Sequence, residues 1–154
     1  MTRIAIFANL LTYSTVASQP LFYSIAFTAA QRALSAGAYV ELRQRINAVM
    51  TRRVPVIYLA ALVTSACVLA LSWYAQNWNV LITTALALVC LVADIALMLR
   101  ENVPINGVMD RWSATDPPAD WERYRNQWFF VYRFRQVILL LGFASILLGA
   151  VFQN

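Results

Sequence analysis

The fold of this chain is decided by residues 121–152, WERYRNQWFFVYRFRQVILLLGFASILLGAVF. The part from Trp128 onward supplies the roughly 20 apolar residues with which a helix crosses ~30 Å of hydrocarbon. The part before it is polar, and Asp116 and Pro118 upstream favour a helix start because they suit a cap and a first turn. We therefore expect one helix that extends ~15 Å beyond the membrane before crossing it.

Three more apolar runs precede this last span (128–152), at residues 4–30, 54–74 and 80–99. Hydrophobic residues make up 61% of the 154 and charged residues 12%, whereas soluble domains carry roughly 25% charged residues. Within a bilayer, helices satisfy their own backbone polar groups. The sequence predicts an all-α fold, in which residues 1–154 form a single four-transmembrane-helix bundle whose last helix extends into the cytoplasm. Pro104 is expected to end the third helix near Asn102.

The distribution of charge predicts how the bundle is oriented. All twelve basic residues are arginine, and all except Arg3 lie in or beside the first and third connections. The second connection, residues 75–79, has no charged residue, and every acidic residue except Asp94 lies in the two charged connections. Arginine-rich connections stay in the cytoplasm. We therefore expect an integral protein of the bacterial inner membrane, with both termini outside and the charged loops cytoplasmic.

The first connection has two interpretations. Gln44, Asn47 and Met50 recur at helical spacing, which predicts that this connection is partly helical. In the first interpretation this connection is a basic surface segment that lies against anionic lipid, and in the second it is a lid over the mouth of the bundle. Its arginines are Arg32, Arg43, Arg45, Arg52 and Arg53.

A stripe of aromatic and basic residues runs along the last helix. Its members, spaced by four, three, four and three residues, are Trp121, Arg125, Trp128, Tyr132 and Arg135. Residues at this spacing share one helix face. Arg135 enters the apolar region, where a cation needs a partner or an outlet to water, so we expect it to face the bundle interior. Arg133 lies on the opposite face and is expected to extend to lipid headgroups.

Asp94 is the one acidic residue well inside a span. It lies seven residues before Glu101 and ~9 Å inside the helix end. An unpaired carboxylate at that depth is very unfavourable, so Asp94 is expected to meet a donor, either Arg135 or Tyr132. It is a functional carboxylate, or one half of a buried ion pair that fixes helix packing.

Further polar side chains are expected at the same depth. Gln19 and Tyr23 approach the charged end of the first span, and Tyr58 lies one turn inside the second. A single polar residue of this kind is explained by a hydrogen bond between helices. As a set they predict a polar-walled pocket, formed by Gln19, Tyr23, Tyr58, Asp94, Tyr132 and Arg135.

Several function classes are disfavoured. The chain has no histidine, which argues against haem, di-iron and copper sites, and we expect neither a metal nor a cofactor. The positive charge is explained by membrane orientation, so no nucleic acid is expected as a partner. Four short spans without an inverted repeat are not typical of a transporter.

A family resemblance rests on residues 102–135. The motif residues are Asn-Val-Pro-Ile-Asn-Gly at 102–107, then Trp112, Asp120, Trp121, Arg125, Trp128 and Arg135. Together with the hydropathy layout, this pattern resembles the anthrone oxygenase-like family of small four-helix membrane proteins. That family carries a Pro-Ile-Asn box after its third span and an Arg-Trp-x-x-x-His-x-x-Arg pattern entering its fourth. Tyr132 stands here where the family usually has histidine.

Most members of that family have no assigned function, and its best-understood branch resembles an oxygenase that converts anthrones to anthraquinones without a cofactor. Positions that match the family's motifs are Asn102, Pro104, Asn106, Trp121, Arg125, Trp128 and Arg135. Because Tyr132 replaces the histidine, this protein cannot use a histidine base at that position.

Two hypotheses of function follow. In the first, the chain is a membrane oxygenase or redox enzyme for a lipophilic aromatic or phenolic molecule. Asp94 or Glu101 is then the base, Tyr132 donates to the substrate oxygen, and Arg135 stabilises the anion. The expected substrate-binding residues are Asn102, Asn106, Trp128, Arg125, Trp121, Tyr23, Gln19 and Tyr58. In the second, the chain is a non-catalytic accessory subunit, within a homo-oligomer or hetero-complex, or a protein that binds lipid or quinone.

Overall fold

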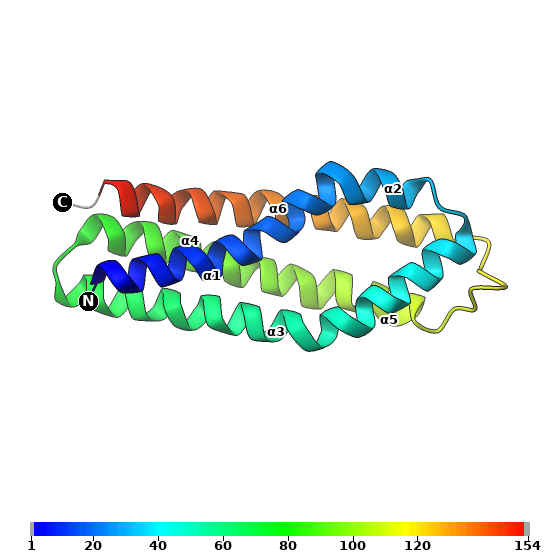
Figure 1. Cartoon of the computed structure of the whole chain (residues 1–154), viewed down its shortest axis with the longest axis horizontal. Helices are drawn as coiled ribbons and strands as arrows, with labels where there is room; N and C mark the ends of the chain where they lie inside the picture. The colour runs from blue at the N-terminus through cyan, green and yellow to red at the C-terminus, as the bar shows by residue number, and fades with distance from the viewer. Residues whose placement is uncertain (1, 153–154) are drawn as a thin grey trace.

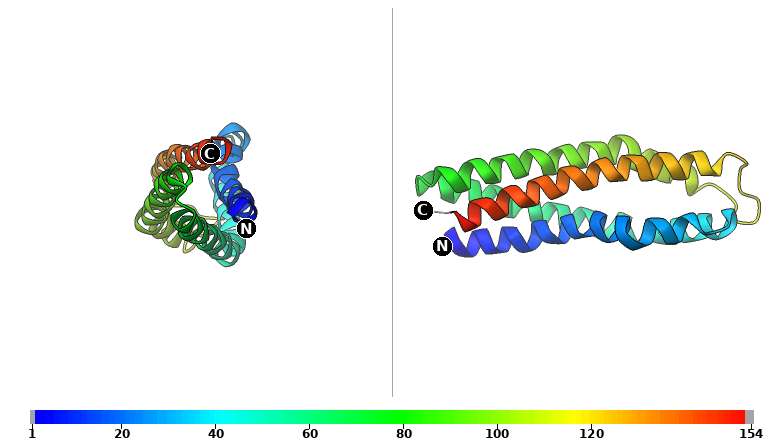
Figure 2. Two further views of the ribbon diagram at one scale, coloured as in Figure 1. Left: turned by 90° about the vertical axis from the view of Figure 1, so that its left-hand side faces the viewer. Right: turned by 90° about the horizontal axis from the view of Figure 1, so that it is seen from above.

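A computed structural model describes residues 2–152, apart from the Pro20 side chain, and throughout this range the fold is all-α. Four helical rods run antiparallel to their neighbours (Figure 1). Their elements are, in order, α1 (Thr2–Phe22), η1 (Tyr23–Phe27) and α2 (Thr28–Arg32); α3 (Ala36–Tyr74); α4 (Trp78–Leu97), η2 (Met98–Asn102) and α5 (Val103–Met109); and α6 (Trp121–Val151). Seen along the long axis, the rods surround a common centre in the order α1, α3, α4 and α6 (Figure 2).

The two ends of the bundle differ. Residues 2 and 152 lie at one end together with the tight turn at residues 75–77, and we call this the terminal end (Figure 1). Gln76 has a φ of 56° in that turn, and Asn77 caps α4 by accepting a hydrogen bond from the Val80 amide. The opposite end, which we call the loop end, carries the connections at residues 33–35 and 110–120.

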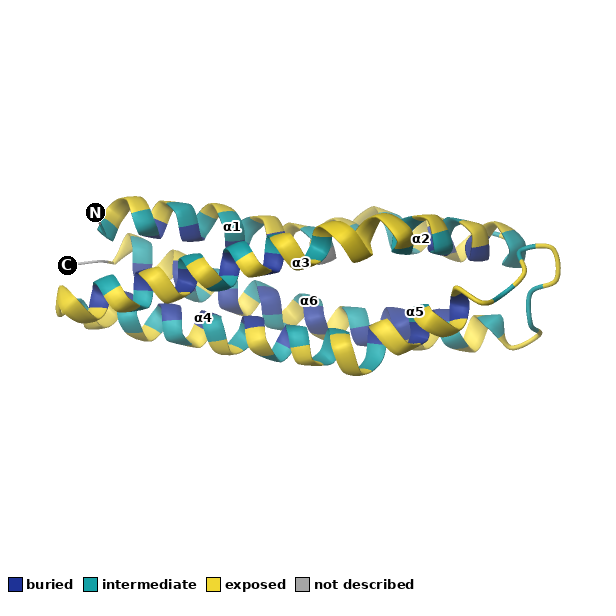
Figure 3. Cartoon of the chain, turned by 90° about the horizontal axis from the view of Figure 1, so that it is seen from below, coloured by how far each residue is buried: buried dark blue, intermediate teal, exposed yellow. Residues whose placement is uncertain are grey.

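Three of the rods are long and apolar enough to cross a membrane: Ala36–Tyr74, Trp78–Met109 and Trp121–Val151. Large apolar side chains such as Leu59, Leu86 and Leu141 are exposed on their outward faces. Burial is confined to the sides that face the centre (Figure 3). An exposed apolar surface of this extent is typical of helices that face the lipids of a bilayer.

Several predicted helix limits are wrong. The second helix begins at Ala36, so the first connection is almost entirely helical. The third rod does not stop near Asn102 but continues to Met109, because Pro104 falls in the first turn of α5, where a proline needs no amide hydrogen bond. The last helix begins at Trp121 and not at Asp116–Pro118, which lie in the loop.

The terminal half of the bundle is closely packed. Its core is formed by Tyr13, Val16, Leu91 and Leu139, all without exposed surface. Gly142 lets α6 approach this core so closely that a Cβ there would lie 2.9 Å from the Cys90 Cβ and closer still to the Tyr13 ring.

Polar side chains fix α1 against α3 within this half. The Asn9 Oδ1 accepts hydrogen bonds from Ser65 at 2.9 Å and from Thr64 at 3.2 Å, and Thr12 pairs with Thr64 at 2.8 Å. Such bonds between helices stabilise a membrane bundle by roughly 0.6 kcal/mol each. They account for the polar character of the first rod.

The loop half is built differently, because three helices depart from regular α geometry there. Pro55 lies inside α3, where it removes a backbone hydrogen bond, and α3 changes direction along its length (Figure 1). In η1 the Thr28 amide bonds to the Tyr23 carbonyl, and in η2 the Val103 amide bonds to the Met98 carbonyl. These wide π turns occur frequently at functional sites. They re-aim side chains toward the space between the rods.

Candidate functional site

Asp94 and Arg135 form a buried ion pair between α4 and α6. The Arg135 Nε donates to Asp94 Oδ1 at 2.8 Å, and Nη2 donates to Oδ2 at 3.2 Å. The Tyr58 hydroxyl donates to Oδ2 at 2.6 Å, and Asn102 accepts from the Arg135 Nη1 at 3.0 Å. The prediction that Asp94 meets a donor on the last helix is confirmed for Arg135. No hydrogen bond joins Tyr132 to Asp94 within residues 2–152.

This ion pair is enclosed by the helices. Asp94 has no exposed surface and Arg135 keeps 6%. Buried charges are tolerated when they are paired and hydrogen-bonded, and both Asp94 oxygens are engaged. Arg135 and Tyr58 therefore separate the carboxylate from the space between the rods. Asp94 is placed to orient these two side chains, and the prediction that it would line the pocket is wrong.

A second polar group surrounds Arg43, one turn of α3 closer to the loop end than Asn47. The Arg43 Nη1 donates to the Tyr23 hydroxyl at 2.7 Å, and Nη2 donates to Asn106 Oδ1 at 2.8 Å. Gln31 also donates to the Tyr23 hydroxyl, at 2.8 Å, and Asn106 donates to Asn47 Oδ1 at 3.2 Å. The first and third rods are thereby joined to α3 by side-chain hydrogen bonds.

Aromatic rings lie between these two polar groups. Trp128 and Tyr132 are stacked, with ring centroids 4.6 Å apart and planes 18° from parallel. Tyr23 packs against both rings, at 4.8 Å from Tyr132 and 5.2 Å from Trp128. The guanidinium carbon of Arg43 lies 4.0 Å from the Trp128 ring centroid, and that of Arg135 lies 5.4 Å from the Tyr132 ring centroid. We call Tyr23, Trp128 and Tyr132 the aromatic wall.

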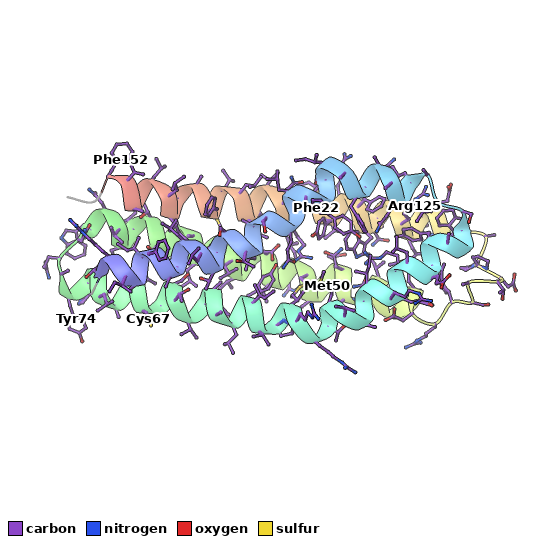
Figure 4. The ribbon with its side chains drawn as sticks, in the orientation of Figure 1. Phe22, Met50, Cys67, Tyr74, Arg125 and Phe152 are labelled. Carbon is purple, nitrogen blue, oxygen red and sulfur yellow. The ribbon has the colours of Figure 1, made fainter. Side chains whose placement is uncertain are left out.

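The aromatic wall borders an open-sided cavity of about 650 Å³ in the loop half of the bundle. Arg43, Arg135, Tyr58, Asn102 and Asn106 contribute polar atoms, while most of the remaining lining is apolar. Apolar side chains that also line the cavity are exposed on the outer surface, namely Phe22, Met50, Leu99 and Val103. Phe22 and Met50 lie near the middle of the molecule, on α1 and α3 (Figure 4). The cavity thus opens through the sides of the bundle. Its volume lies in the range of small-molecule sites.

Most of the predicted pocket residues line this cavity. They are Gln19, Tyr23, Tyr58, Asn102, Asn106, Trp128, Tyr132 and Arg135. Glu101 is different, since it does not line the cavity, and its role as the alternative base stays a prediction that the geometry does not favour.

Trp121 and Arg125 are also misplaced by the prediction. Arg125 lies 4.5 Å over the Trp121 ring and pairs with Glu122 at 3.1 Å, and neither residue lines the cavity. Trp121 packs against Tyr39, with ring centroids 5.4 Å apart. Arg125 lies closer to the loop end than Phe22 and Met50 do (Figure 4).

Arg43 and Asn47 are site residues that the sequence analysis missed. With Val54 and Tyr58 they follow helical spacing along α3, and all four line the cavity. The helical spacing that links Arg43 to Tyr58 was present in the sequence, but it does not distinguish Arg43 from the exposed arginines of the same segment. The interpretation of the first connection as a basic surface segment needs one correction, because Arg43 is buried and lines the cavity together with the neighbouring part of α3.

The site is chemically suited to hold a flat, lipophilic ring. The aromatic wall can stack on it, and two guanidinium groups can hold its oxygen atoms. Within residues 2–152, no group of three or more cysteine, aspartate or glutamate side chains gathers where it could hold a metal ion. Comparisons of the chain with protein-family models, with curated proteins and with solved structures find no match.

Proposed function

We propose that this protein is an integral protein of the bacterial inner membrane that binds a lipophilic aromatic small molecule, a phenol or a quinone, taken from the bilayer. The observation that carries the proposal is the open-sided cavity, which combines an aromatic wall with two buried guanidinium groups. A water-soluble ligand would need an aqueous entrance. Here the exposed apolar rim favours entry from the lipid phase.

In this proposal α1 is a fourth crossing, and the loop end is cytoplasmic. Exposed arginines at the level of the cavity support this orientation, since Arg52, Arg53, Arg100 and Arg133 can reach the headgroups of the inner leaflet. The cavity then lies at the cytoplasmic interface, with the loop-end parts of α3, α5 and α6 in the cytoplasm. A C-terminal reporter that is active only in the cytoplasm should be silent, and activity would contradict the topology.

Binding can be tested with protein purified in a mild detergent. We expect a naphthoquinone or an anthrone to bind. Tyr132→Ala should weaken the affinity by about tenfold, because stacking of the ligand on the Tyr132 ring contributes ~1 kcal/mol or more. The matched control is Phe130→Ala, which removes an exposed ring from the opposite side of the same helix. Equal effects of the two substitutions would contradict the proposed site.

The same purification distinguishes ligand binding from an accessory role. Mass spectrometry and absorbance of the purified protein should reveal a bound aromatic molecule and a single polypeptide, as a monomer or a homo-oligomer. A stable complex with a second polypeptide, without any bound aromatic, would instead support an accessory subunit.

A second candidate is cofactor-independent oxygenation of the bound molecule, and the paired guanidinium groups favour it. An anthrone that loses a proton becomes an electron-rich anion, which reacts with dioxygen to give the anthraquinone and water. Arg43 and Arg135 are placed to stabilise the anion in the cavity. Because Asp94 is covered, the proton must leave to solvent or a base other than Asp94.

Turnover of anthrones and hydroquinones tests this candidate. Arg135→Gln should reduce anthrone oxidation by at least about tenfold, because removal of one oxyanion-stabilising donor commonly has an effect of that size or larger. If Asp94→Asn and Arg135→Ala both leave turnover unchanged, the oxygenase candidate is refuted while the binding proposal is unaffected.

A further inference from the structure

Arg43 is a buried cation without a carboxylate partner. It keeps 3% of its surface exposed and lines the cavity. Its contacts are the neutral oxygens of Tyr23 and Asn106 and the face of the Trp128 ring. Its Nε has no hydrogen-bond partner. This is an unusual state for a group that carries a full charge.

The other buried arginines are neutralised. Arg135 pairs with Asp94 and Arg125 pairs with Glu122, whereas none of the ion pairs formed within residues 2–152 includes Arg43. Asp110 also lines the cavity, but it is exposed and reaches Arg43 only through the amides of Asn47 and Asn106. The charge of Arg43 is thus left uncompensated at the cavity surface.

Trp128 provides a second unused donor beside it. The indole Nε1 is buried without a hydrogen-bond partner, and the Trp128 ring lies 4.0 Å from the Arg43 guanidinium. A cation over an aromatic face is stabilised by up to roughly 2 kcal/mol, which offsets only part of the free energy of burying it. The Arg43 Nε and the Trp128 indole N–H both lack an acceptor beside the same cavity, which points to an acceptor on the ligand.

We infer that the ligand is an anion, and that Arg43 recognises its charged oxygen. The chemical class is an acidic phenol or hydroxyquinone that is ionised at neutral pH, with its ring against the aromatic wall and its oxyanion on Arg43. Arg135 adds little net charge, because Asp94 already neutralises it, and it contributes to the site as a hydrogen-bond donor. This inference rests on the proposed function and names the charge state of the molecule that the cavity takes.

A matched pair of probes tests it: 2-hydroxy-1,4-naphthoquinone, which is ionised at neutral pH, and neutral 2-methoxy-1,4-naphthoquinone. Both are titrated into full-length protein in a phospholipid-free neutral detergent. We expect the hydroxy compound to bind at least about tenfold more tightly, which is ~1.4 kcal/mol. Arg43→Gln should abolish this preference, with the methoxy affinity kept within about twofold. Arg43→Lys should keep part of the preference, and Arg52→Gln, on the exposed side of α3, should keep all of it.

A measurement on the wild-type chain makes the test independent of how the variants fold. Lowering the pH until the hydroxy compound is protonated should weaken its binding to that of the methoxy compound, whose affinity should stay unchanged. If wild type binds both probes equally, or if Arg43→Gln keeps the preference, the charge inference is wrong and the aromatic site stands. If neither probe binds, the proposed function and the inference both fall. A competition experiment separates this ligand from a lipid. If an added anionic phospholipid displaces the bound hydroxy compound as strongly as an excess of the neutral probe does, Arg43 binds a lipid headgroup and the inference is overturned.

Discussion

Arg135 lies between Asp94 and the cavity, and holds the carboxylate at 2.8 Å from its Nε while it presents its own guanidinium to the cavity. The order of these residues matters for mechanism. The carboxylate acts on a bound molecule through Arg135 and Tyr58, whose positions it fixes, and does not accept a proton from that molecule directly.

The Asp94–Arg135 ion pair should make a large contribution to the free energy of unfolding. Asp94→Asn leaves Arg135 buried with no counter-charge, and we expect a loss of ~3–5 kcal/mol in the free energy of unfolding in detergent. The measurement is denaturant-induced unfolding followed by circular dichroism. Glu101→Gln is the control, because Glu101 forms no ion pair within the described residues, and it should shift stability by less than about 0.5 kcal/mol. The effects of Asp94→Asn and Arg135→Gln should be less than additive when combined. Additive losses would contradict direct coupling.

Tyr132 offers a test of the oxygenase candidate. Tyr132→His places an imidazole in the cavity at the position where the resembled family usually has histidine. If the candidate is right, anthrone oxidation should increase by at least about tenfold above pH ~6.5, where an ordinary imidazole is neutral and can accept a proton. Tyr124→His adds histidine outside the cavity and should change nothing. Unchanged turnover in folded Tyr132→His would argue for binding without catalysis.

The lateral opening predicts how a ligand arrives. Leu99→Trp and Met50→Trp enlarge side chains at the rim, so uptake of a quinone from vesicles should slow severalfold. Stopped-flow fluorescence in reconstituted vesicles measures this rate. Leu86→Trp, which adds an indole on an exposed face of α4 away from the cavity, should leave it unchanged. A rate that is insensitive to both rim substitutions would indicate entry from the aqueous side.

Close packing in the terminal half should make Gly142 intolerant of a side chain. The Cβ of Gly142→Ala would overlap the Tyr13 ring, which has no exposed surface and donates its hydroxyl to the Ala87 carbonyl at 3.0 Å. Overpacking of this kind commonly destabilises by ~1–3 kcal/mol. Gly107→Ala is the matched control, since a Cβ there meets no atom within 4 Å. Thermal denaturation of the two variants side by side is the check, and similar melting temperatures would contradict tight packing at Gly142.

Sequence patterns predicted the four helices and a donor for Asp94, for clear physical reasons. Apolar runs of membrane length have few alternatives to helices. A carboxylate inside an apolar span needs a donor, and helical spacing placed Arg135 and Tyr132 on the inward face of the last helix. The choice between these two donors stayed open in the sequence, and the structure shows that it is Arg135.

The remainder of the site depended on features that periodicity does not encode. Arg43 lies in a segment whose other arginines are exposed, and its burial is set by the bend in α3 and by contacts with Tyr23 and Asn106. Pro104 was expected to stop a helix because its neighbouring π turn was not foreseen. Trp121 and Arg125 share a stripe with Tyr132 but lie beyond the cavity along the helix axis. Helical spacing shows which residues share a helix face, but it does not show how far along the helix axis the cavity extends.

The two wide turns, η1 and η2, each accommodate one more residue than a regular turn. Since one residue rotates a helix by about 100°, the inward stripes on either side of each turn are out of phase. Deleting a single amino acid within Tyr23–Phe27 would bring the two halves of the first rod back into step. A chain shortened in this way would move Tyr23 away from Trp128 and Tyr132, and the cavity would keep only two of the three rings that face a bound molecule.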